Sequence, residues 1–161
     1  MCNSLINVMP PSASFQNLRV MRVQECRSLI NIGTSSAAKS LVQLTQMRIL
    51  ECENIIEVVG NHGDVTEDEI IFPKLKRLQL GVLPSLTSFC SWNVTLEFPS
   101  LEELIVFKCP KMKIFSQGVL TTQMLREIKI DKESIELHPD VDINKAIQQY
   151  HEKMVCIDSL S

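Results

Sequence analysis

One pattern of apolar residues returns along the chain at nearly constant intervals. The first complete copy has apolar residues at seven positions: Phe15, Leu18, Met21, Val23, Cys26, Leu29 and Ile32. All seven positions are apolar again 26 residues later, and once more after further shifts of 31 and 26 residues. A last shift of 24 residues still matches at three positions: Leu125, Ile128 and Ile130. This periodicity indicates an array of similar units, each of which can bury its apolar edge only against its neighbours.

The spacing inside each copy predicts the local structure. The third and fourth apolar positions are two residues apart, as in a strand with both side chains on one face. The other positions are three residues apart, which is typical of tight, 3₁₀-like turns. Each copy therefore predicts one short strand followed by an irregular return. Stacked copies make an α/β leucine-rich-repeat solenoid, with a curved parallel β-sheet on its concave side and an irregular or 3₁₀ convex side.

Two segments depart from the repeat. The longer step between the second and third copies places an acidic insertion at Gly60–Ile71, which we expect to be a mobile loop. Near the end, Asp142 is a suitable N-cap for a helix whose apolar stripe is Ile143, Ile147, Tyr150 and Met154. We expect residues 1–133 to form about five repeats, the first of them truncated. Residues 134–161 are expected to form a capping helix and tail.

Composition narrows the function classes. The chain has 161 residues, with 16 basic against 19 acidic side chains, so its net charge predicts no nucleic-acid or membrane partner. No apolar run is long enough to cross a bilayer, and the first residues lack the charged and apolar regions of a secretory signal. Six cysteines are too few for a disulfide scaffold, which favours a reduced, cytoplasmic location. Because Met1 falls inside a repeat, we expect the chain to be the C-terminal piece of a longer protein.

One segment resembles a catalytic motif. Residues 33–40 read GTSSAAKS, which differs from the phosphate-binding GxxxxGK(S/T) loop at Ala38, where that loop has its second glycine. The segment lies between the return of one repeat and the start of the next, so we expect a solvent-facing convex turn. A nucleotide hydrolase that uses Lys39 is the enzyme alternative to a non-catalytic chain.

The remaining reactive residues predict no site. Cys2, Cys26, Cys52 and Cys109 share one core slot, which Leu83 occupies in the third copy, so we expect them to be buried small hydrophobes. Stacking also leaves a disulfide between Cys26 and Cys52 geometrically open. The three histidines, His62, His138 and His151, are scattered and suggest no metal site. Asn93 begins a glycosylation sequon that matters only in a secreted chain.

Several phrases of the sequence resemble a known family. FPKLKRLQLGVLPSLTSF, FPSLEELIVFKCPKMKIFSQG and the closing INKAIQQYHEKM are similar to the C-terminal leucine-rich repeats of plant intracellular immune receptors. These are the coiled-coil receptors that carry a nucleotide-binding (NB-ARC) domain before their repeats. The resemblance covers roughly residues 1–155. It implies a sensor that recognises a pathogen effector or a guarded host protein and also contacts upstream domains of its own receptor. It places the ATP/ADP switch upstream, so no cofactor is expected in this chain.

The concave face is the candidate binding surface. Its outward residues include a basic front half at Arg22, Arg48 and Arg77 and an acidic back half at Glu103, Glu127 and Asp131. Leu50, Ile105 and Phe107 add apolar groups, as protein-binding patches often do. The candidate protein-binding residues are Arg22, Arg48, Leu50, Arg77, Gln79, Glu103, Ile105, Phe107 and Lys129.

The sequence therefore predicts a protein-recognition and autoinhibitory repeat domain of a plant intracellular immune receptor. Two interaction-class alternatives remain open. One is the substrate-recruiting module of a ubiquitin-ligase adaptor, and the other is an ectodomain fragment of an extracellular leucine-rich-repeat receptor.

Overall fold

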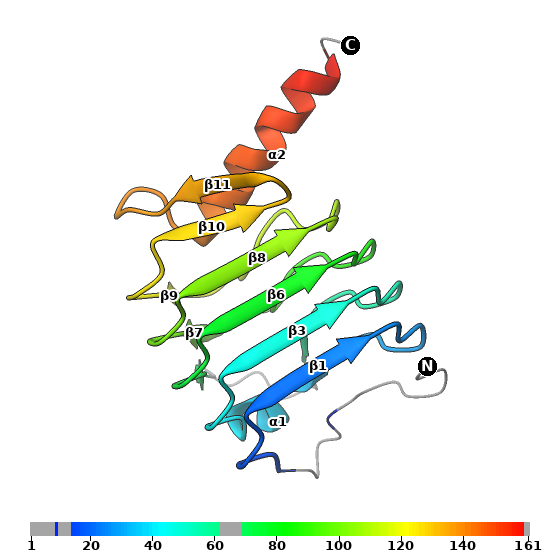
Figure 1. The fold of residues 1–161 in the computed structure, drawn as a ribbon, viewed down its shortest axis with the longest axis vertical. Helices are drawn as coiled ribbons and strands as arrows, with labels where there is room; N and C mark the ends of the chain where they lie inside the picture. Colours follow the sequence, from blue (N-terminus) through cyan, green and yellow to red (C-terminus); the bar gives the residue numbers. More distant parts are fainter. Residues whose placement is uncertain (1–8, 10–13, 62–68, 160–161) are drawn as a thin grey trace.

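The predicted short strands lie side by side, one from each repeat, in the order of the sequence (Figure 1). The computed structural model describes residue 9 and residues 14–61 and 69–159. Its largest sheet has the strand order β1-β3-β6-β8-β10-β11. These strands are β1 (Val20–Gln24), β3 (Gln46–Leu50), β6 (Arg77–Gly81), β8 (Glu103–Phe107), β10 (Glu127–Ile130) and β11 (Glu133–Glu136). The first five are parallel, and β11 is antiparallel to β10.

The register of the sheet follows the predicted offsets. Met21 pairs with Met47, Met47 with Leu78, and Leu78 with Leu104, so equivalent positions of successive repeats are neighbours. Along each parallel strand, buried and more exposed residues alternate, as in the pattern of β1. The inward residues join one continuous core with the three-apart positions of the return segments. The leucine-rich-repeat solenoid is therefore confirmed.

Each parallel strand ends at a residue with a positive φ angle. The φ values lie between 50° and 56° at Glu25, Glu51, Val82, Lys108 and Asp131. This conformation turns the chain out of the sheet while the backbone amide still bonds to the next repeat. For example, the amide of Glu25 donates to the carbonyl of Leu50 at 3.1 Å. None of the five residues is glycine, and for an L-residue a left-handed backbone costs about 1–2 kcal/mol. The stacking contacts must therefore outweigh that cost in every repeat.

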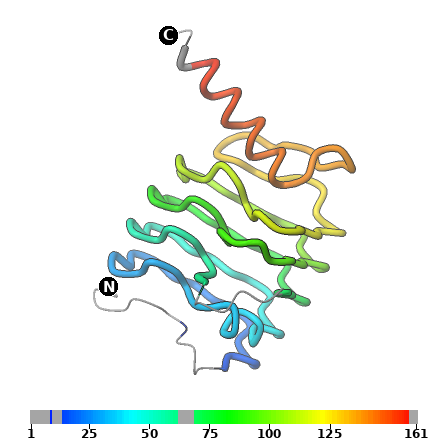
Figure 2. Tube along the Cα trace, turned by 180° about the vertical axis from the view of Figure 1, so that it is seen from behind, coloured from blue at the N-terminus to red at the C-terminus, as the bar shows by residue number. Residues whose placement is uncertain are grey.

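The return side is more regular than the predicted irregular or 3₁₀ convex side. It carries a two-stranded sheet of β2 (Gly33–Thr34) and β4 (Val59–Gly60), and a three-stranded sheet of β5 (Glu69–Ile71), β7 (Thr95–Glu97) and β9 (Leu120–Thr121). A one-turn helix, α1 (Ser35–Lys39), lies on the same side (Figure 2). The described residues contain no 3₁₀ helix. The regular segments arise because equivalent backbone positions of stacked returns lie close enough to hydrogen-bond.

Four phenylalanine rings stack along the core behind the sheet. Phe72 is stacked on Phe98 with ring centroids 5.2 Å apart, and Phe89 is stacked on Phe115 at 5.0 Å. Edge-to-face contacts join the two pairs. All four rings are fully buried. Phe72 and Phe98 fill the first slot of their repeats, and Phe89 and Phe115 fill the last, so repetition of the sequence places like rings on like rings.

The predicted loop at Gly60–Ile71 is shorter than expected at both ends. Gly60 is buried at the end of β4, and Glu69–Ile71 forms β5. The intervening residues 62–68 lie outside the described residues, so the mobility predicted for them stays a prediction.

The helix predicted near the end is present as α2 (Ile143–Ser159). Its N-cap is Asp142, as predicted, because Oδ1 of that residue accepts a hydrogen bond from the Lys145 amide at 2.9 Å. Ile143 and Ile147 are buried against the last coil, whereas the distal part of the helix projects away from the solenoid (Figure 1). The expected domain boundary at 133–134 falls inside β11.

The side chain of Asn144 on α2 takes the place of a further coil. In the preceding coils, the backbone at this position donates to the next coil, as from the Phe89 amide to the Phe115 carbonyl at 2.8 Å. At the end of the stack, Asn144 Oδ1 accepts from the amides of Phe115 at 2.7 Å and Ser116 at 3.2 Å. Asn144 Nδ2 donates to the Ser116 carbonyl at 2.8 Å. One amide side chain therefore satisfies three backbone groups of the last coil.

A second link joins the helix to the sheet. The Tyr150 hydroxyl donates a hydrogen bond to Oδ2 of Asp131, the residue that ends β10, and Oδ1 of Asp131 accepts from the Lys108 amide at 2.8 Å. Partial burial and then the Asp131 carboxylate raise the pKa of Tyr150 to about 12. The folded chain therefore holds this proton more tightly than the unfolded chain. The corresponding stability is fully present below pH 10 and is lost as the pH rises toward 12.

We expect Asp131→Asn to bring the Tyr150 titration back toward pH 10, because the variant removes the negative charge that opposes ionisation. Asparagine also tolerates the positive φ of this position. Tyr150 is the chain's single tyrosine, so the rise of phenolate absorbance with pH reports on it alone. The urea-unfolded chain provides the reference midpoint. A midpoint that stays near 12 in the variant would show that the carboxylate has no part in the shift.

Candidate functional site

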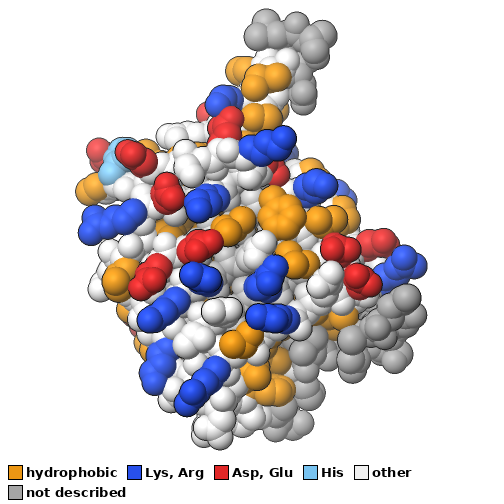
Figure 3. Space-filling view, viewed as in Figure 1, with side chains coloured by type: hydrophobic (Ala, Val, Ile, Leu, Met, Phe, Trp, Pro, Cys, Tyr) orange, Lys and Arg blue, Asp and Glu red, His pale blue; other side chains and the backbone are white. Residues whose placement is uncertain are grey.

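The outward residues of the parallel strands form three rows across the sheet, which together we call the sheet face. The register defines the rows as Val20, Gln46, Arg77 and Glu103; Arg22, Arg48, Gln79, Ile105 and Lys129; and Gln24, Leu50, Gly81 and Phe107. All nine predicted binding residues therefore lie on one surface. Figure 3 shows basic side chains gathered over β1, β3 and β6, and acidic ones more frequent toward the C-terminal strands.

The arginines do not form a single line, contrary to the predicted alignment. Arg22 and Arg48 are direct neighbours in the middle row, but the residue beside Arg48 on β6 is Gln79. Arg77 lies one row away, between Gln46 and Glu103. The alignment was wrong because matching residue types by eye ignores the two-residue step between Arg77 and Gln79. The three arginines nevertheless border one groove of about 480 Å³.

The arginines differ in their partners. Arg77 Nε lies 3.6 Å from Glu103 Oε2, which makes an exposed ion pair across β6 and β8. Among the described residues, neither Arg22 nor Arg48 has a carboxylate or hydrogen-bond partner. The Nε atom of Arg48 is buried and unpartnered within that part of the chain. Like charges on directly opposed positions of two strands are destabilising, so this pair lowers the stability of the free fold.

The predicted acidic back half is smaller than expected. Glu103 is paired with Arg77, and Glu127 precedes Ile128, which pairs with Leu104. Asp131 does not contribute a free carboxylate, because both its oxygens accept hydrogen bonds from Lys108 and Tyr150. Asp131 is therefore part of the connection between the last coil and α2.

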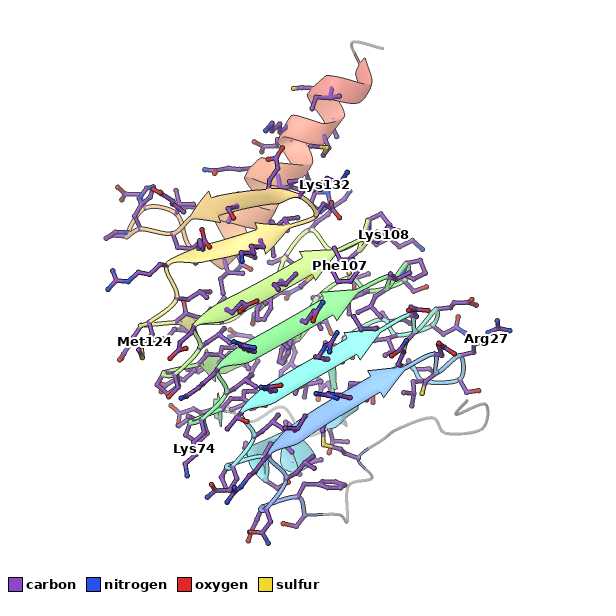
Figure 4. The ribbon with its side chains drawn as sticks, in the orientation of Figure 1. Arg27, Lys74, Phe107, Lys108, Met124 and Lys132 are labelled. Atoms are coloured by element: carbon purple, nitrogen blue, oxygen red, sulfur yellow. The ribbon has the colours of Figure 1, made fainter. Side chains whose placement is uncertain are left out.

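The apolar residues of the sheet face are half-buried, which is less exposed than predicted. The ring of Phe107 lies directly over Gly81 on the adjacent strand, where an added Cβ would come within 2.2 Å of a ring carbon. Glycine at this outward position is thus required by the ring above it. Because Gly81 pairs with Leu50 on its other side, Leu50, Gly81 and Phe107 form an apolar corner (Figure 4). Ile105 lies in the middle row, between Gln79 and Lys129.

The segment that resembles a phosphate loop is packed into the return side, so the predicted solvent-facing turn is wrong for most of it. Thr34, Ala37 and Ala38 are buried, and a Cβ on Gly33 would meet Met9. Thr34 Oγ1 already accepts from the amide of Ala37, an amide that a bound phosphate would require. The resemblance to the motif therefore does not extend to its geometry.

The cysteines behave as core residues. Cys26, Cys52 and Cys109 are buried reduced thiols, so no disulfide joins Cys26 to Cys52. Each thiol donates to the carbonyl two residues earlier, as from Cys52 to Leu50 at 3.3 Å. Burial raises the pKa of Cys109 to about 11, which keeps this thiol protonated at neutral pH. Cys2 lies outside the described residues.

The histidines of the described part lie apart from one another. His138 closes a turn with Val141, and the ring of His151 is 2.5 Å from the Met112 carbonyl. His62 lies outside the described residues. Within residues 9, 14–61 and 69–159, no group of three acidic, histidine or cysteine side chains could hold a metal ion. Asn93, at the start of the sequon, is exposed.

Stacked parallel strands, buried repeat positions and one open sheet face define a leucine-rich-repeat protein, a class that serves as a protein-interaction module. Residues 7–53 match the family described as plant disease resistance protein RPS2-like, leucine-rich repeats. No helix in the described part of the chain combines the length and apolarity that a membrane span requires. No solved structure gives a significant match to the chain.

Two relatives from Arabidopsis thaliana extend this result. The probable disease resistance protein At1g61190 is 28% identical over 130 residues, which are 80% of this chain and 13% of the relative. The probable disease resistance protein At5g47260 is 31% identical over 105 residues, which are 62% of this chain and 10% of the relative. The chain thus spans about an eighth or less of the length of these relatives. It is a leucine-rich-repeat region related to those of plant disease resistance proteins.

Proposed function

We propose that the chain is the sensor region of a plant intracellular immune receptor and recognises a pathogen effector or a guarded host protein through the sheet face. Its repeats also contact upstream domains of the same receptor and help to hold that receptor inactive. The receptor acts in the cytoplasm, and a nucleotide switch of the NB-ARC type lies outside this chain. Recognition of this kind works by different contacts in the resting and active states, without catalysis here.

The observation that supports this proposal is the Arg22–Arg48 pair. Two adjacent, unpaired cations weaken the fold that carries them, and one of them has a buried Nε without an acceptor. The core positions of the same strands are all apolar and well packed, so the repeat does not need arginine there. A partner that supplies acceptors would offset the cost and gain affinity from it.

Charge reversal tests the proposal in the complete receptor that contains the chain. We expect Arg22→Glu combined with Arg48→Glu to abolish pathogen-triggered cell death in leaf tissue or to cause cell death without a pathogen. Folding should not change, because both residues point away from the core. The matched control is Arg27→Glu combined with Lys113→Glu, which makes the same charge change at exposed residues outside the strands. Equal responses from the wild-type receptor and the sheet-face variant, at equal protein levels, would contradict the proposal.

A further inference from the structure

We infer that the groove over β1, β3 and β6 binds a short acidic segment of a partner protein in an extended conformation, with an apolar side chain of that segment on the Phe107 corner. This inference rests on the proposed function and specifies the chemistry of the partner. It follows from the charges of the groove, its unpaired polar groups and its neighbouring apolar corner.

The charge of the groove is positive and local. Arg22, Arg48 and Arg77 border it, with Glu103 as its one acidic side chain at the β8 end. Neighbouring strands are about 4.8 Å apart, so the three guanidinium groups can reach carboxylates on one extended peptide. Arginine binds carboxylates with two parallel hydrogen bonds, and Arg48 Nε has no other acceptor within the described residues.

The polar groups around the arginines suit a peptide backbone. Gln46 and Gln79 line the same groove, and neither side chain makes a hydrogen bond to another described residue. Each amide can donate to a carbonyl and accept from an N–H group. The groove therefore offers charged contacts for acidic side chains and neutral contacts for the main chain between them.

The surroundings of the groove limit the length of the ligand. Beyond the strand ends lie Glu25, Glu51 and Glu53, which border a separate pocket with Arg27. On the other side, Glu103 is followed by Glu127 on the next strand. A long polyanion such as a nucleic acid would cross these carboxylates, whereas a segment with two or three acidic residues would not. This favours a protein partner.

The apolar corner gives the segment a direction. Phe107 is two strands and two residues away from Arg48, which corresponds to about 12 Å. An extended peptide covers that distance in about three or four residues. We therefore expect two acidic residues at alternate positions, followed about four positions later by Leu, Ile or Phe. The ring of Phe107 already stands over Gly81 and presents its face to such a side chain.

The test measures binding of a fluorescein-labelled peptide, GEGEGSGLG, to the whole chain by anisotropy. Reference peptides are GQGQGSGLG, which lacks the charges, and GEGEGSGSG, which lacks the apolar residue. We expect the acidic peptide to bind at least 10-fold more tightly than the uncharged one. Its affinity should fall between 50 and 200 mM NaCl, because the contacts are between ions. Loss of the leucine should weaken binding about threefold or more.

Variants assign the binding to the groove. Arg22→Gln and Arg48→Gln should each weaken binding of the acidic peptide by about 5- to 10-fold, while Arg48→Lys should recover part of the loss. Arg27→Gln, an exposed arginine of the same repeat that points away from the groove, should stay within twofold of the wild type (Figure 4). Phe107→Ala should abolish the difference between the two acidic peptides. Thermal unfolding of each variant checks that the fold is retained.

Other outcomes would overturn the inference. Equal affinity for charged and uncharged peptides, or equal losses in Arg27→Gln and Arg48→Gln, would show that the groove does not select acidic segments. Tighter binding of a single-stranded oligonucleotide than of the peptide would assign the cluster to nucleic acid. If charge reversal changes the immune response while the acidic peptide fails to bind, the proposed function stands and this inference falls. If the peptide binds while the response is unchanged, the reverse holds.

Discussion

Phe98→Ala is expected to destabilise the chain by about 3–5 kcal/mol, the usual range for removing a buried aromatic ring from a core. Phe98 contacts all three of the other stacked rings, Phe72, Phe89 and Phe115. Its loss opens a cavity between two coils, where each coil depends on its neighbours for burial. Because marginal proteins have about 5–15 kcal/mol in total, the variant should be close to unfolded at 37 °C.

Urea unfolding followed by the fluorescence of Trp92, the single tryptophan, measures this effect. Phe98→Leu should cost distinctly less, because leucine fills most of the cavity. The matched control is Phe107→Ala, since this ring lies on the half-exposed sheet face and not in the core. Equal losses for Phe98→Ala and Phe107→Ala would contradict the claim that the stacked rings hold the coils together.

The second large effect is expected at the end of the stack, where Asn144→Ala should destabilise the chain by about 2–3 kcal/mol. The variant removes the acceptor of two amides and the donor of one carbonyl, and each unsatisfied group in a poorly hydrated site costs about 1–3 kcal/mol. Local opening should exceed global unfolding, because the damage is confined to the last coil and α2. Hydrogen exchange at the Phe115 and Ser116 amides should therefore accelerate strongly.

Two further variants make this prediction specific. Asn144→Asp keeps the acceptor oxygen and loses only the donor, so its effect should be smaller than that of Asn144→Ala. Gln149→Ala, at an exposed position of the same helix, should change neither stability nor exchange. If Gln149→Ala and Asn144→Ala behaved alike, the side chain of Asn144 would not be closing the stack.

The strands and the core were predictable because they depend on spacing alone. A constant offset between copies gives the register of parallel strands, and the two-residue step marks the inward pair of each strand. The face of Arg22, Arg48 and Phe107 follows from the same alternation. These features repeat, so an error in one copy is corrected by the others.

The unrepeated features were not predictable in the same way. Asn144 replaces a backbone that has no counterpart in its own repeat, and a single asparagine in a helix carries no signal of that role. The Tyr150–Asp131 bond joins residues 19 positions apart in a geometry set by α2. The partial order of the return side depends on close approach of coils. Gly81 could have been noticed, because a glycine inside a strand often marks a group packed above it.

The alternation along each strand has a consequence for natural variation. Residues such as Met21 and Val23 carry the stability of a repeat, while their immediate neighbours, such as Arg22 and Gln24, face outward. A substitution at an outward position changes the chemistry of the surface without touching the fold. Alleles could therefore diverge in specificity while they keep the same melting temperature. A library randomised only at the outward positions should yield mostly folded proteins with new ligands.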